Sequence, residues 1–113
     1  MGEAVLLPAD LEIIHQPARL KLMTLLYRHG DVGFTEAQRS LDLTPGNLDA
    51  HQRKLAGEGL LEARKALLRT GFEVRLKLTP AGADRFQAYL DWLDSFMAAA
   101  RESKRLLAGG RPP

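Results

Sequence analysis

The chain has 113 residues and no cysteine, which excludes disulfides, cysteine-ligated zinc sites and thiol catalysis. Histidine occurs only three times, and no histidine or carboxylate pair stands at convincing ligand spacing. We therefore expect no metal and no other cofactor. No apolar run approaches the ~20 residues of a membrane span, and the N-terminus lacks the basic-then-apolar pattern of a secretory signal. We expect a cytoplasmic protein without a membrane partner.

The residue sets of common catalytic mechanisms are also missing. The chain shows no Ser-His-acid arrangement, no carboxylate pair in an apolar setting and no glycine-rich phosphate loop. Gly46, Gly57 and Gly59 are explained more simply as residues that begin or end helices. The sequence therefore predicts that the protein is not an enzyme.

The residues that are present indicate one ordinary globular domain. Hydrophobic residues make up 45% and charged residues 27% of a chain whose length suits a single core. We assign residues 1–107 to that domain and expect the tail 108–113 to be disordered. The net charge is only +2, but the segment 44–78 holds seven basic against four acidic residues. This excess permits a polyanionic partner without requiring one.

Apolar periodicity predicts helices in the first part of the chain. A short helical lead-in over 10–15 precedes a helix over 17–29, which has proline in its first turn and glycine directly after it. Thr35 and Gln38 have the spacing of a capping box. A short helix should therefore follow them and run through Leu41.

A third helix is predicted over 45–57. Thr44 supplies a hydroxyl cap, and proline occupies the first helical position, where no backbone donor is needed. Leu48 and Leu55 should face the core. Gln52 lies between them on the same face, so a polar side chain stands where a core residue is expected.

The second half of the chain predicts a hairpin and a long helix. Residues 60–67 and 73–79 have the composition and alternation of strands. The connection 68–72 is a plausible loop in which Gly71 can adopt a positive φ. A long helix over 80–107 should follow.

The last helix carries a wide apolar stripe with two possible explanations. It can cover the core of its own chain, or it can pair with the same helix of a second copy. Because the stripe would leave a large exposed apolar patch on a monomer, we favour a homodimer. The predicted dimer residues are Phe86, Tyr89, Trp92, Leu93, Phe96 and Met97.

Two short helices joined by a tight turn and followed by a basic hairpin form the plan of a winged helix-turn-helix. The predicted fold class is therefore mainly α with a small β-hairpin (α+β), ending in a long C-terminal dimerisation helix. The helix 45–57 would fit the major groove, which is ~12 Å wide and presents a distinct hydrogen-bond pattern for each base pair. The hairpin 60–79 would be the wing, with arginines that can reach the DNA backbone.

Three short motifs, in this order and spacing, resemble a known family. They are His15-Gln-Pro-Ala-Arg-Leu20; Leu43-Thr-Pro-Gly-Asn-Leu48 with the following Ala50-His51, Arg53-Lys54-Leu55 and Gly59-Leu60-Leu61; and Leu78-Thr-Pro-Ala-Gly82. Over residues 11–95 the chain is similar to small stand-alone winged-helix transcriptional regulators near the ArsR and MarR groups.

The resemblance implies a cytoplasmic transcription factor that binds double-stranded DNA as a homodimer. The positions that it places against DNA are Thr44, Gly46, Asn47, Ala50, Arg53, Lys54, Arg69 and Arg75. Two residues depart from the family pattern: Gln52, where relatives usually have leucine, and Asp49, where they often have a small residue. A carboxylate at Asp49 can accept a hydrogen bond from cytosine N4 or repel phosphate.

A second class of function stays open. The hairpin is apolar at Leu67, Leu68 and Phe72, which suits a winged helix that docks on a partner protein without specific DNA binding. Phosphate binding would instead need a continuous basic face formed by the recognition helix and the wing. The residues name no small-molecule effector.

Overall fold

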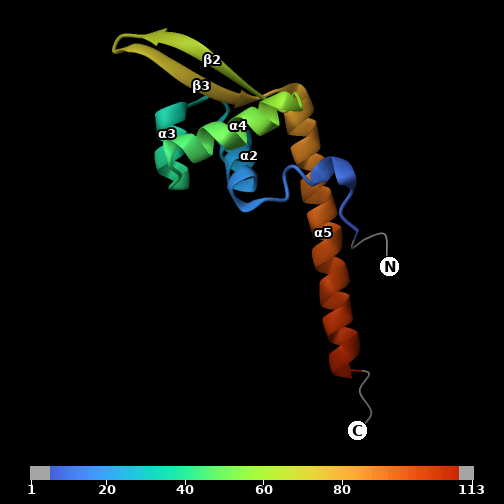
Figure 1. Cartoon of the computed structure of the whole chain (residues 1–113). Helices are drawn as coiled ribbons and strands as arrows, with labels where there is room; N and C mark the ends of the chain where they lie inside the picture. The colour runs from blue at the N-terminus through green and yellow to red at the C-terminus, as the bar shows by residue number, and fades with distance from the viewer. Residues whose placement is uncertain (1–5, 110–113) are drawn as a thin grey trace.

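The structure is a computed structural model that describes residues 6–109 (Figure 1). A group of helices carries a three-stranded antiparallel sheet, and a long C-terminal helix extends away from both. In chain order the elements are η1 (Ala9–Leu11), α2 (Pro17–His29), β1 (Val32–Gly33), α3 (Phe34–Leu41), α4 (Pro45–Gly57), β2 (Leu61–Leu68), β3 (Gly71–Leu78) and α5 (Pro80–Gly109). The predicted fold class is confirmed.

The helices α2 and α4 have the bounds that the sequence predicts. Each has proline in its first turn, where the missing N–H costs no intrahelical hydrogen bond. Each is also capped by a side chain. Gln16 accepts from the backbone N–H of Arg19 at 2.8 Å, and Thr44 Oγ1 accepts from the backbone N–H of Asn47 at 3.1 Å. Local chemistry therefore sets where both helices begin.

The short helix α3 begins differently from the prediction. It starts at Phe34 with Gly33 as its N-cap residue, and no side chain caps it, so the predicted capping box at Thr35 and Gln38 is wrong. The cause is the strand before it: Val32 and Gly33 pair with β3, and the chain passes from the sheet directly into the helix. A two-residue strand leaves no alternating pattern in a sequence, so β1 was not predicted.

The hairpin β2–β3, called the wing below, has a tighter turn than predicted. β2 reaches Leu68 and β3 begins at Gly71, so only Arg69 and Thr70 lie between the strands, in place of the expected loop 68–72. Gly71 adopts a φ of 116°, as its predicted freedom allows. The strand order β1-β3-β2 puts β3 at the centre of the sheet.

The hydrophobic core lies between α2, α4, the sheet and the first part of α5. Leu22 and Leu26 of α2 and Leu48 and Leu55 of α4 are fully buried there. Gln52 is also buried, with 7% of its surface exposed, as its position between the two leucines of α4 predicts. One face of α4 is thereby fixed against the core, which leaves the opposite face outward.

The first turn of α5 approaches the root of the wing at Gly82. A Cβ atom on this residue would lie 1.9 Å from the carbonyl oxygen of Leu60. Thr79 holds the approach together, because its hydroxyl accepts from the Gly82 backbone N–H at 2.9 Å and donates to the Gly59 carbonyl at 2.5 Å. Only glycine leaves room for this packing.

The two ends of the chain differ slightly from the prediction. The lead-in expected over 10–15 is the single 3-10 turn η1, followed by further turn structure as far as Ile14. At the other end, α5 continues through Ala108 and Gly109, which were expected in the disordered tail. Residues 110–113 of that tail lie outside the described residues.

Candidate nucleic-acid interface

The outer face of α4 gathers six of the eight residues predicted to contact DNA. All six are exposed. Gly46, Asn47, Ala50, Arg53 and Lys54 lie on the side of the helix away from the buried leucines, and Thr44 is the N-cap residue directly before it. Figure 1 shows this helix below the wing, running from α3 toward α5. The local cap and the core-facing leucines together produce this arrangement, because they set where the helix starts and how it is rotated.

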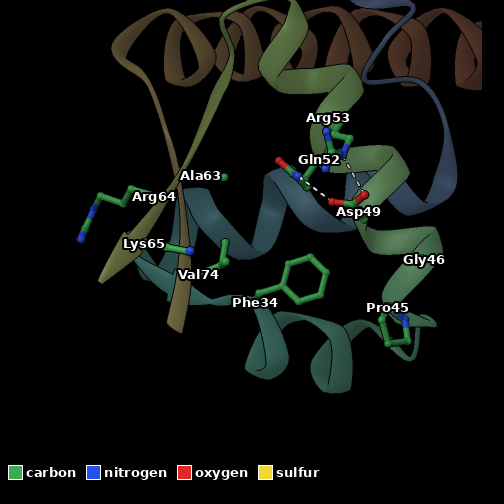
Figure 2. Close-up of a pocket in the computed structure, with 10 residues that line it drawn as sticks. All are labelled: Phe34, Pro45, Gly46, Asp49, Gln52, Arg53, Ala63, Arg64, Lys65 and Val74. Carbon is green, nitrogen blue, oxygen red and sulfur yellow. Dashed lines mark hydrogen bonds and ion pairs between the residues drawn. The ribbon is translucent and has the colours of Figure 1, made fainter. Parts of the chain in front are cut away.

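Three side chains of α4 form a hydrogen-bonded chain beside this face (Figure 2). Gln52 Nε2 donates to Asp49 Oδ1 at 3.1 Å, and Arg53 Nε donates to Asp49 Oδ2 at 2.8 Å. The hydrogen bond from Arg53, aided by that from Gln52, lowers the pKa of Asp49 below its ordinary value. Asp49 is therefore a carboxylate at neutral pH, and Arg53 faces solvent with a neutralising partner.

A cleft of about 590 Å³ separates the first half of α4 from the wing. Phe34 and Val74 contribute to its apolar part, and its charged residues are Asp49, Arg53, Arg64 and Lys65 (Figure 2). The first half of α4 faces the hairpin across this cleft, although α4 and β2 are in contact elsewhere, so residues of both elements line one hollow.

The wing uses most of its charged residues internally. Arg75 Nε donates to Asp31 Oδ1 at 2.9 Å, Arg75 Nη2 donates to the Asp31 carbonyl at 2.9 Å, and Arg64 also pairs with the Asp31 carboxylate. These contacts lower the pKa of Asp31, chiefly through the hydrogen bond from Arg75, and that hydrogen bond also raises the pKa of Arg75. Glu73 lies 3.4 Å from the same guanidinium.

The DNA contact at Arg75 stays a prediction, but the Arg75 guanidinium is already held by Asp31 and Glu73. Its side chain is only a quarter exposed and is held against the start of β1, because β3 lies between β1 and β2 in the sheet. Arg69, the other arginine predicted to contact DNA from the wing, lies exposed in the two-residue turn. Of the two arginines, Arg69 is therefore better placed to bind a DNA phosphate.

The tip of the wing is apolar, as the sequence indicates. Leu67 and Phe72 are cross-strand partners with 72% and 73% of their surfaces exposed, and Leu68 is also exposed. Lys65 Nζ lies 6.0 Å from the centre of the Phe72 ring, at the outer limit of a cation–π contact. The tip thus combines an apolar pair with nearby positive charge.

The predicted dimer residues of α5 divide into two groups. Phe86 and Tyr89 are buried in their own chain, so their assignment to a dimer surface is wrong. Phe86 packs against Tyr27 at 4.9 Å between ring centres, and the Tyr89 hydroxyl hydrogen-bonds His15 Nδ1 at 2.8 Å. Burial raises the pKa of Tyr89. Phe96 is exposed, and Trp92, Leu93 and Met97 are half-buried.

The sequence analysis missed two groups of residues. Asp31 could be found only once the strand register was known, because that register brings Arg64 and Arg75 opposite each other beside it. The second group continues the heptad spacing of the α5 stripe beyond Ala100, at Ser103 and Leu107. A search for apolar residues does not find it readily, because Ser103 is polar.

Other kinds of site find little support. Residues 6–109 contain no group of three His, Asp or Glu side chains able to hold a metal ion. Within the same part of the chain, no helix combines the length and the apolar character needed to cross a membrane.

A family model described as a winged helix DNA-binding domain matches residues 18–97. The chain belongs to this winged-helix family. The winged-helix protein is 30% identical over 80 residues to the uncharacterised protein MJ0432 of Methanocaldococcus jannaschii, in a match that covers 71% of this chain and 87% of the relative. The predicted winged helix-turn-helix is thus confirmed.

Solved structures agree with this assignment. A transcriptional regulator homologue from Pyrococcus horikoshii OT3 superposes with a TM-score of 0.75 at 30% identity, over 79% of the winged-helix chain and 88% of its own. A protein assigned to the MarR family of transcriptional regulators, from Enterococcus faecalis V583, gives a TM-score of 0.73 at 26% identity, over 86% and 87% of the two chains.

Proposed function

We propose that this winged-helix protein is a sequence-specific DNA-binding transcriptional regulator that acts as a homodimer, with α4 in the major groove. The observation that carries the proposal is the outer face of α4. Six residues at the positions expected to meet DNA are exposed together, and the core lies entirely on the other side of the helix. Membership of a DNA-binding family and the likeness to transcriptional regulators support it.

The chemistry of this face suits direct reading of base pairs. Asn47 lies in the first turn of α4, where a side-chain amide can bond adenine through two hydrogen bonds. Arg53 lies six residues further along the helix and can bond guanine or a phosphate. Gly46 and Ala50 carry little side chain, so the helix can approach the base edges closely. Lys54 would supply a phosphate contact that carries no sequence information.

The wing would contribute mainly through Arg69. This residue lies in the turn of the hairpin, where it can reach a phosphate beside the site bound by α4. Arg75 would instead hold the hairpin in place through Asp31. The proposed DNA surface is therefore α4 together with the wing turn, without the central strand.

Dimer formation would use the outer part of α5. Beyond the buried Tyr89, five exposed or half-buried residues of α5 lie at heptad spacing: Leu93, Phe96, Ala100, Ser103 and Leu107. The Ser103 hydroxyl donates to the Ala99 carbonyl at 3.0 Å, so it needs no partner from a second chain. Two such helices can pair by knobs-into-holes packing. A two-fold dimer would then present two copies of α4 about one DNA turn, ~34 Å, apart.

Selection from a library of random duplexes tests the central proposal. The purified protein should recover a palindromic consensus whose half-sites lie about one helical turn apart, ~34 Å. Binding to that consensus should also fall steeply as the salt concentration rises. Recovered duplexes that are no richer in any sequence than the starting library would contradict sequence-specific regulation.

The dimer is tested separately by light scattering during gel filtration. Phe96→Asp places a charge in the heptad stripe and should give a monomer of half the wild-type mass. Ala98→Asp is the matched control, because it adds the same charge to an exposed position of α5 outside the stripe. If both variants keep the wild-type mass, α5 is not the interface.

The apolar wing tip favours a second candidate, a winged helix that binds a partner protein. Leu67 and Phe72 together form an exposed apolar pair that phosphate binding does not require. The two candidates differ in their electrostatics. A DNA regulator loses affinity for its consensus in high salt and on Arg53→Ala, whereas a docking module shows one weak affinity for every duplex, unaffected by Arg53→Ala.

A further inference from the structure

Asp49 and Gln52, the two α4 residues at which the chain departs from the family it resembles, are hydrogen-bonded to each other. Asp49 in turn accepts from Arg53 Nε at 2.8 Å. We propose that Asp49 is a positioning residue, which holds Arg53 in the geometry needed to bind one guanine of the operator. The inference rests on the proposed function, because it assigns a specificity role within the DNA surface of α4.

The anchor of this arrangement lies in the core. Gln52 is 7% exposed and is held between Leu48 and Leu55, so its amide has little freedom to move. A buried amide is costly unless it is hydrogen-bonded, and Asp49 Oδ1 satisfies its NH2 group at 3.1 Å. The position of Asp49 is thereby tied to the rigid interior of the domain.

Arg53 is tied to Asp49 by one nitrogen only. The Arg53 side chain is 75% exposed, and within residues 6–109 its only hydrogen bond is the one from Nε. Among the same residues, Nη1 and Nη2 of Arg53 make no hydrogen bond, so their donors are available. These two nitrogens match the N7 and O6 acceptors of guanine in the major groove.

The charge balance also favours a role in specificity. Asp49 and Arg53 together are formally neutral, so the pair gives little attraction to phosphates in general. An unpaired arginine on this face would bind any duplex more tightly. Asp49 therefore lowers non-specific affinity while it preserves the directed donors of Arg53, which widens the difference between correct and incorrect sites.

Direct base reading by Asp49 is less well supported. Each of its oxygens already accepts one hydrogen bond from its own helix, and its side chain is less exposed than that of Arg53. The two models differ in which base pair depends on Asp49. A positioning residue acts at the base pair bound by Arg53, whereas a direct reader acts at a cytosine of its own.

The experiment measures affinities for the selected consensus and for duplexes with one base pair changed. Asp49→Asn should lose about tenfold discrimination at one G·C pair, with unchanged or tighter binding to unrelated DNA. Arg53→Ala should lose discrimination at the same pair. The double variant Asp49→Asn/Arg53→Ala should discriminate no worse there than Arg53→Ala alone.

Asp42→Asn is the matched control. It removes one carboxylate just before α4, from an exposed residue in the left-handed conformation that asparagine also tolerates. It should alter general DNA affinity without changing discrimination at any base pair. Gln52→Leu should weaken discrimination in the same direction as Asp49→Asn, because it releases the anchor of Asp49.

The outcomes separate the inference from the function on which it rests. If the wild type selects a consensus and Asp49→Asn discriminates as well as wild type, the positioning role is overturned and the regulator remains. If Asp49→Asn acts at a different base pair, additively with Arg53→Ala, Asp49 is a direct reader and the inference is equally overturned. If the wild type selects no consensus, the proposed function and the inference both fall.

Discussion

The helix α4 and the wing both carry positive charge, but they use it differently. α4 has Arg53 and Lys54 on an exposed face, and the single ion pair found there among the described residues lies between neighbours on the same helix. The wing has more basic residues, yet Arg64, Arg75 and Lys77 all pair with carboxylates. The number of basic residues in a segment therefore does not measure the charge that it offers to a partner.

The difference follows from the geometry of the two elements. On a helix, Asp49 and Arg53 stand four residues apart and point outward together. In the hairpin, Arg64 and Arg75 lie directly opposite each other, where like charges repel. Asp31 offsets this repulsion by accepting from both. The wing thus uses Arg64 and Arg75 to hold the sheet together, whereas Arg53 of α4 lies at the surface.

Gly82→Ala should have the largest effect, because α4 and the wing share the root that Gly82 packs against. A methyl group 1.9 Å from the Leu60 carbonyl must displace α5. We expect a loss of about 3 kcal/mol in the free energy of unfolding. Thermal and urea unfolding followed by circular dichroism measure it. Gly57→Ala is the control, since nothing lies near its Cβ position, and it should not destabilise. Equal stability of Gly82→Ala and wild type would show that the root can adjust.

Arg53→Ala tests the α4 side of the comparison. It should cost about 2 kcal/mol in binding to the selected consensus, because Arg53 donates to a base or phosphate there. Its effect on stability should be small, since an exposed ion pair between residues four apart contributes little to the free energy of unfolding. Fluorescence anisotropy with labelled duplex and a thermal unfolding curve measure both quantities. A large fall in stability with unchanged binding would reverse the roles assigned to α4 and the wing.

Asp31→Asn tests the wing side, with the opposite expectation. Losing the charged acceptor of Arg75 and Arg64 should lower the free energy of unfolding by about 1 kcal/mol at neutral pH. Consensus affinity of the folded variant should be nearly unchanged. Asp94→Asn serves as the control, because it removes an exposed carboxylate further along α5.

The pH dependence of Asp31→Asn has a defined sign. The pKa of Asp31 is lowered in the folded state, so its contribution to stability is complete above the unfolded pKa, about 4, and is lost as the pH falls further. The stability gap between wild type and Asp31→Asn should therefore close in acid. A gap that stays constant from neutral pH to about pH 2 would contradict the ion-pair assignment.

Arg69→Ala should give the smallest effect. Without this arginine one phosphate is no longer neutralised, so consensus binding should weaken a few-fold and the salt slope should fall by about 1. Stability should not change, because Arg69 is exposed in the turn. Arg75→Ala is the comparison variant and should lower stability while the salt slope stays the same. The reverse pattern would restore Arg75 to the DNA surface.

Much of this molecule followed from local sequence signals. The cap at Thr44, the prolines at helix starts and the leucine spacing predicted α2 and α4 with their bounds, because those signals act within one helical turn. They also predicted that Gln52 would lie on the buried face. The exposure of the α4 face follows from the same spacing, so most of the candidate interface could be predicted from the sequence alone.

The strand register and the path of the N-terminal segment decided the rest. Asp31 lies beside Arg64 and Arg75 because the strand that follows it, β1, pairs with β3. The same pairing leads the chain directly into α3, so the predicted capping box at Thr35 does not form. Phe86 and Tyr89 were wrongly predicted to lie on a dimer surface. In the fold they contact Tyr27 and His15, which are distant in the chain. Contacts between distant residues depend on how whole elements pack. The pattern within a single helix or strand does not show which other elements will pack against it.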